Sequence, residues 1–271
     1  MNGPPPTRFP PELPFAARMT FDPAFFATPA FVLTVIAAFV AALVRGFTGF
    51  GAALTFIPVA SAAYGPTVAA PTLLIIDFLF ALPIAAKVLP AVRWRTVLPA
   101  AFAAMAVVPL GAWALSVGDP TALRWTISAV ILVLVALVAS GLRYHSEPAI
   151  PASAAVGSIS GFLSGFAQIA GPPVIALWVS GPHPAATIRA NLFVFFTLTS
   201  LSSFTAYYLR GLFTVDVLRL TLSVAPVYAL AMFTGSWLFH RLGGAGYRPL
   251  AYVVVVLAAI TSAPLFDGIW R

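Results

Sequence analysis

The chain has 271 residues, of which 61% are hydrophobic and 8% are charged, and its formal net charge is +7. A soluble domain carries roughly 25% charged residues. The composition therefore excludes a soluble protein and predicts an all-α protein that crosses a lipid bilayer many times. The basic residues are scattered at the ends of apolar segments, which membrane topology explains, so we expect no nucleic-acid partner. The chain has no cysteine and its histidines do not cluster with acids, so we expect no cofactor and no metal site.

In chain order, the sequence predicts a proline-rich tail at 1–24, a first membrane half at 25–140, a polar linker at 141–151 and a second membrane half at 152–271. In the first half we expect apolar segments at 25–44, 50–64, 67–86, 97–117 and 122–140. In the second half we expect them at 150–166, 171–181, 186–209, 217–239 and 249–265. Boundaries read in this way are good to a few residues.

Two of these apolar stretches are interrupted by glycine, proline and polar residues. Ala41–Pro58 reads AALVRGFTGFGAALTFIP, and Ser160–Leu177 reads SGFLSGFAQIAGPPVIAL. Irregular backbone at membrane depth must be buried in protein or line a cavity, and paired interruptions in two halves indicate the binding site of a transporter. We expect new helices to begin within Gly49–Ala53 and Ala170–Val174, where free N–H groups would attract an anion.

The two halves resemble copies of each other. Gly46-Phe47 recurs as Gly165-Phe166, 119 residues later, and a Gly-x-Trp motif at Gly111 recurs at Gly235, 124 residues later. Such recurrence indicates a duplication. We expect each half to contain a broken helix or helical hairpin followed by three transmembrane helices. Whether each half has four or five membrane segments stays open, and an odd number would make the halves inverted copies, which we favour.

Four motifs carry a resemblance to a known family. Arg45–Gly51, RGFTGFG, continuing to Pro58, resembles the first glycine-rich motif of the sulfite exporter TauE/SafE family, also called the toluene-sulfonate uptake permease family. Its second motif is similar to GFLSGF followed by AGPP, and its second-half signatures are similar to IRANL and GLFTVD. The resemblance covers nearly all of the chain after residue 25. It implies sulfite or an organosulfonate as cargo, a bacterial inner-membrane location and no catalysis. Where the family often has further glycines, this chain has Gln168-Ile-Ala170.

Three charged residues lie in or beside apolar stretches. Arg45 is either an anchor for an anionic cargo, since a guanidinium grips an oxyanion with two parallel hydrogen bonds, or the cap of a helix C-terminus. Arg189 has no counterpart in the first half and is either a cargo contact or an interfacial arginine. Asp77 is either a proton carrier or the counter-ion of an arginine.

Neutral residues near the interruptions complete the predicted site. Hydroxyl and amide groups could donate hydrogen bonds to the cargo, or could simply bond the preceding helical turn. The glycines could expose backbone, or only allow close helix packing. The predicted substrate-binding residues are Arg45, Gly46, Thr48, Gly49, Phe50, Gly51, Ser164, Gln168, Gly171, Arg189 and Asn191, with Asp77 as coupling residue or counter-ion.

These features predict a secondary transporter that binds a small sulfur anion between the two interruptions and releases it by alternating access. An anion channel is a close alternative. An intramembrane hydrolase is disfavoured, because no histidine lies within a predicted span and Asp77 is the only deep carboxylate.

Overall fold

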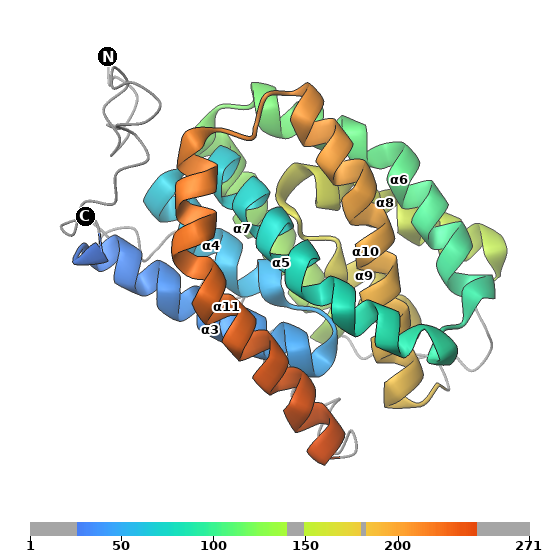
Figure 1. Cartoon of the computed structure of the whole chain (residues 1–271). Coiled ribbons are helices and arrows are strands. Elements are labelled where there is room, and N and C mark those ends of the chain that lie inside the picture. Colours follow the sequence, from blue (N-terminus) through green and yellow to red (C-terminus); the bar gives the residue numbers. More distant parts are fainter. Residues whose placement is uncertain (1–25, 140–148, 180–182, 243–271) are drawn as a thin grey trace.

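The computed structural model describes residues 26–139, 149–179 and 183–242, and these residues are helical apart from their connections (Figure 1). Their helices are α3 (Pro29–Thr48), α4 (Ala52–Tyr64), α5 (Pro66–Val88), the short 3₁₀ helix η1 (Leu89–Ala91), α6 (Trp94–Val117), α7 (Pro120–Ala139), α8 (Ile150–Ala167), α9 (Gly171–Val179), α10 (Ala185–Leu209) and α11 (Val215–Arg241). The predicted tail 1–24, most of the linker 141–151 and the predicted last segment 249–265 lie outside the described residues.

Six of the described helices, α3, α5, α6, α8, α10 and α11, are long and apolar enough to cross a membrane, which makes this a multi-pass membrane protein. The predicted segments agree with the helices to within a few residues. The largest differences are at the two ends of α3, which is predicted at 25–44 and spans Pro29–Thr48.

Both predicted interruptions are real breaks between helices. After α3, Gly49 and Gly51 adopt left-handed backbone with φ of 84° and 92°, and α4 begins at Ala52. After α8, Gln168 adopts φ of 59°, and α9 begins at Gly171. Both new helices therefore start inside the predicted windows. Glycine suits the first break because it lacks the Cβ that penalises left-handed backbone, whereas Gln168 adopts the same conformation with a full side chain.

The helices that precede the breaks pack on the other half of the chain. A Cβ added at Gly46 of α3 would lie 2.9 Å from the Ser236 amide nitrogen of α11, and a Cβ added at Gly165 of α8 would lie 2.7 Å from the Ala112 amide nitrogen of α6. Ser236 follows Ala112 by 124 residues, as Gly235 follows Gly111, so the two contacts are equivalent. Each half thus places the helix that carries its Gly-x-Trp motif, α6 or α11, against the broken helix of the other half.

The glycines of α6 and α11 pack equally closely against the backbone of the broken helices. A Cβ at Gly111 would meet the backbone of Phe162 and Phe166 in α8, and a Cβ at Gly235 would meet the backbone of Leu43 and Phe47 in α3. Along α8, Gly157 and Gly161 lie against Ala100 and Ala104 in turn, so α6 and α8 run in the same direction. Small residues allow such close backbone approach between membrane helices.

These contacts group the long helices into two units of three. In the α6/α8/α10 unit, the Arg93 amide at the start of α6 donates to Asn191 Oδ1 at 2.8 Å, and Ser202 Oγ donates to the Met105 carbonyl at 2.8 Å. Helix α10 therefore runs parallel to α6. The α3/α5/α11 unit is joined by the same kind of close packing between α3 and α11 and by polar contacts from α5. The first half of the sequence supplies α3 and α5 to one unit and α6 to the other.

Candidate functional site

A cavity of about 40 Å³ lies between the two units, and both breaks line it. Helices α3 and α5 provide its charged groups, and α8, the break after it and α10 provide hydroxyl, amide and aromatic groups. The lining residues are Arg45, Phe50, Gly51, Ala52, Ala53, Leu54, Leu73, Leu74, Asp77, Ser164, Gln168, Ile169, Gly171, Phe196, Thr199 and Ser200. The two sequence motifs, more than a hundred residues apart, therefore meet at one cavity.

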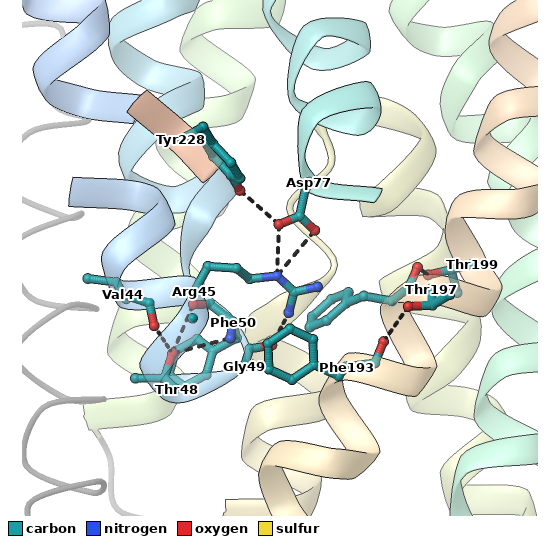
Figure 2. A network of polar contacts seen from close by, with 12 residues as sticks. Val44, Arg45, Thr48, Gly49, Phe50, Asp77, Phe193, Thr197, Thr199 and Tyr228 are labelled. Carbon is teal, nitrogen blue, oxygen red and sulfur yellow. Dashed lines mark hydrogen bonds and ion pairs between the residues drawn. The ribbon is translucent and has the colours of Figure 1, made fainter. Parts of the chain in front are cut away.

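Arg45 is the cation of this cavity. Its side chain is 3% exposed, and Nε donates to both carboxylate oxygens of Asp77, at 2.9 and 3.1 Å (Figure 2). Nη1 donates to the Gly49 carbonyl in the break itself. The guanidinium carbon lies 4.8 Å from the Phe193 ring centre and 4.5 Å from that of Phe196. Among the described residues, no acceptor is bonded to Nη2, so one end of the guanidinium keeps its donors.

Asp77 accepts hydrogen bonds from two residues and remains partly exposed. Besides Arg45, the Tyr228 hydroxyl donates to Asp77 Oδ1 at 2.8 Å, while Oδ2 accepts only the longer bond from Arg45 Nε. The carboxyl side chain is 18% exposed, against 3% for Arg45. Unpaired charges at membrane depth are costly. The Arg45–Asp77 pair removes most of that cost and gives the cavity a formal charge of zero.

The first break is held in shape by Thr48. Its hydroxyl donates to the Val44 and Phe50 carbonyls at 2.9 Å and accepts from the Phe50 amide at 3.2 Å. Gly51 precedes α4 without a side-chain cap. The first amides of a helix have no intrahelical acceptor, and the first residues of α4, beginning at Ala52, line the cavity. These amides form a positive helix end directed at the same space as Arg45.

The second break contributes fewer amide donors. Helix α9 begins Gly171-Pro172-Pro173, and proline has no backbone N–H. Gly171 is therefore the residue of this first turn whose amide can serve the cavity, and it does line it. The donor-rich helix end belongs to the first motif.

Side chains at the second break are tied to α10. Gln168 Nε2 donates to the Ser164 carbonyl at 2.9 Å and to the Tyr207 hydroxyl oxygen at 3.3 Å, and the Tyr207 hydroxyl donates to the Gly165 carbonyl at 2.8 Å. Ser164 Oγ lies 3.4 Å from Ser203 Oγ. This network fixes the left-handed turn at Gln168 and keeps Ser164 and Gln168 on the cavity wall.

Arg189 does not line the cavity. It is buried, with Nη2 donating to the Gly46 carbonyl at 2.7 Å and to Ser236 Oγ at 2.9 Å, and with Nε donating to the Phe47 carbonyl at 3.1 Å. These are carbonyls of the last turn of α3, where a cation is favourable. Asn191, also outside the cavity, accepts the Arg93 amide before α6. Both residues position helices around the breaks.

The family model for sulfite exporter TauE/SafE matches residues 34–262, which is most of the chain. The chain belongs to the sulfite exporter TauE/SafE family. Neither the curated proteins nor the solved structures compared with the chain include a match. The family is one of membrane transporters for sulfite, so the cavity belongs to a transport protein.

In this TauE/SafE protein, α10 contributes one wall of the cavity. The sequence motifs did not predict this wall. Phe196, Thr199 and Ser200 line it. Thr199 Oγ1 donates to the Phe195 carbonyl at 3.0 Å, so its hydroxyl oxygen keeps lone pairs for another donor. The signal in the sequence was the polar run TLTSLSS inside an apolar helix, which marks a helix face that does not meet lipid.

Proposed function

We propose that this protein is a secondary carrier of a small sulfur oxyanion across the bacterial inner membrane, and that the cargo binds in the cavity between the two breaks. The observation that supports this most directly is that Arg45 and both interrupted motifs line a single cavity. Such placement satisfies the rule that irregular backbone in a membrane lies where it lines a cavity. It also places broken-helix ends where transporters bind charged solutes.

The chemistry of the cavity suits an oxyanion. Arg45 Nη2 and the second N–H of Nη1 have the planar geometry that matches two oxygens of one anion. The α4 amides at Ala52 and Ala53 face the same space, and Gln168 and Ser164 supply neutral groups on the opposite wall. Gly46, Thr48 and Gly49 shape the break, and Arg189 and Asn191 hold the surrounding helices, so we assign these five residues to the support of the site.

The size of the cavity favours sulfite over an aromatic sulfonate. A volume of about 40 Å³ holds roughly three water-sized groups, since one water needs about 10–15 Å³ by the same measure. That is close to the three oxygens of sulfite. The ring of a toluene-sulfonate would have to displace Phe50, Phe196 or the leucines of the wall.

We further propose that alternating access moves one helix unit against the other. The α3–α11 and α6–α8 faces are packed backbone to backbone at glycines, and such faces do not slide easily. The boundary between the units instead contains the cavity. The moving parts are then the α3/α5/α11 unit and the α6/α8/α10 unit, each with helices from both halves of the sequence.

The helix directions support inverted repeats. Helix α10 runs parallel to α6, and α11 returns along α10, since Arg189 near the start of α10 bonds Ser236 near the end of α11. Helices α6 and α11 therefore run in opposite directions, although the equivalence of Gly111 and Gly235 makes them counterparts. We propose on this basis that the halves are inverted copies.

Sulfite counterflow in proteoliposomes tests the carrier. The wild-type protein should exchange labelled for unlabelled sulfite with saturable kinetics, which a channel does not do. Arg45→Gln should lower the flux at least about tenfold, because hydrogen bonds to a charged group contribute about 1.5–3 kcal/mol each. Arg95→Gln removes an exposed cation outside the cavity and should leave the flux unchanged.

Two results would count against this proposal. Normal sulfite flux in folded Arg45→Gln protein would remove Arg45 from the site. Transport of toluene-sulfonate as fast as sulfite would contradict the size argument. The folded state of each variant is checked by its elution from a size-exclusion column.

A further inference from the structure

We infer that this cavity takes up a proton together with the anion, and that Asp77 carries that proton. The inference rests on the proposed carrier function and concerns the same site. It assigns a coupling ion, the proton, and makes the protein an anion–proton symporter.

A bound anion changes the net charge of the cavity. Arg45 and Asp77 are the charged residues among those that line the cavity, so the empty site is neutral. A bound monoanion would leave a net charge of −1 in an environment where charges interact far more strongly than in water. One proton on Asp77 restores a neutral site. Anion binding and proton binding must then favour each other, because such coupling is reciprocal.

Oδ2 of Asp77 is the oxygen that can accept the proton. Tyr228 donates to Oδ1 at 2.8 Å, while Oδ2 has only the 3.1 Å bond from Arg45 Nε. A proton on Oδ2 leaves the Tyr228 bond intact and releases Nε from the carboxyl group. The guanidinium is then free to direct Nε and Nη2 together at the anion, which is the two-bond grip that oxyanions favour.

Asp77 is accessible from the cavity, and the other residues that line the cavity offer no second proton acceptor of its kind. The carboxyl side chain is 18% exposed and Asp77 lines the cavity, so water or the anion can reach it. The groups that face it are Arg45 from α3 and Tyr228 from α11, both hydrogen-bonded to it. From α8, α9 and α10, the cavity wall presents Ser164, Gln168, Gly171, Phe196, Thr199 and Ser200. None of these side chains carries a carboxyl or imidazole group, so Asp77 is the group of the cavity wall that can take up a proton.

The cycle is balanced in atoms and charge. One proton enters with one monoanion from one side, bonds to Asp77 Oδ2, and leaves with the anion on the other side, where the Arg45–Asp77 pair forms again. No other bond is made or broken. The net movement of charge is zero, so a pH gradient drives the flux of a monoanion.

The test is sulfite movement in proteoliposomes made with the full chain, with the membrane potential clamped at zero. With an alkaline interior, the wild-type protein should accumulate the singly protonated sulfite monoanion about tenfold per unit of pH gradient, as one proton per monoanion requires. Asp77→Asn mimics the protonated carboxyl group. It should lose this accumulation and still exchange labelled for unlabelled sulfite. Asp119→Asn is the matched control, because asparagine can accept the same two amide bonds at the start of α7.

Sulfite itself takes up a proton near neutral pH, but this contribution is the same for wild type and variant. Accumulation by Asp77→Asn equal to that of the wild type would overturn the inference. If Asp77→Asn does not fold, Tyr228→Phe serves instead, since it removes only a donor to the carboxylate and should change the pH dependence of driven uptake. An unchanged pH dependence in that variant would also overturn it. Wild-type protein without sulfite counterflow would instead refute the proposed function.

Discussion

Replacing Gly46 or Gly165 by alanine should destabilise the protein, because each glycine lies against the backbone of a helix from the other half. The added Cβ would sit 2.9 Å from the Ser236 nitrogen at Gly46 and 2.7 Å from the Ala112 nitrogen at Gly165, and closer still to the carbonyl oxygens of Met232 and Val108. Real Cβ atoms essentially never come within 3.0 Å of such atoms. Backbone atoms cannot rotate away as a side chain can, so the helices must separate.

The magnitude follows from two opposing effects. In a helix, alanine is more favourable than glycine by about 1 kcal/mol. Overpacking a tight contact costs about 1–3 kcal/mol, occasionally more, and a clash with backbone belongs at the upper end. The net loss should be about 2 kcal/mol for each variant, which lowers the melting temperature by about 4–8 °C for a protein of this size.

Thermal unfolding of the purified variants in one fixed lipid or detergent measures this effect. Gly171→Ala is the matched control, because its Cβ would meet the Ile175 side chain at 3.2 Å, which can turn aside. The control should melt within a degree or two of the wild type, about 0.5 kcal/mol at most. Equal or higher melting temperatures for Gly46→Ala and Gly165→Ala would refute the exchanged packing of the two halves.

Three further outcomes test other parts of the structure. Gln168→Gly should change the free energy of unfolding by less than about 1 kcal/mol. Glycine relieves the cost of the left-handed backbone, about 1–2 kcal/mol, and this offsets the lost hydrogen bonds to Tyr207 and Ser164. A larger change on thermal unfolding would contradict this balance. Arg189→Lys should destabilise by about 2–3 kcal/mol, since lysine cannot make the forked contacts, yet the KM for sulfite should stay unchanged in flux assays; a raised KM would place Arg189 in the cargo site. Since the chain has no cysteine, Lys87→Cys and Arg210→Cys at the ends of α5 and α10 should react with an impermeant thiol reagent from opposite sides of the membrane, and reaction from one side would exclude inverted repeats.

The sequence by itself determined where the helices lie and where they break. Apolar length set the membrane segments, and glycine with proline marked the breaks before Ala52 and Gly171, because both depend on local backbone preferences. The recurring glycines also revealed the two similar halves. These features are properties of short stretches of chain, so they are legible without the fold.

The tertiary structure decided which of these residues share the cavity. Arg45 and Arg189 look alike in the sequence, since both are arginines beside glycine-rich or polar motifs, yet Arg45 lines the cavity with Asp77 and Arg189 bonds the end of α3. The sequence also did not predict that α6 packs on α8 and that α11 packs on α3. Which face of a helix meets a cavity depends on how that helix is rotated and crossed against helices far away in the chain, and glycine contacts between distant backbones set that rotation here.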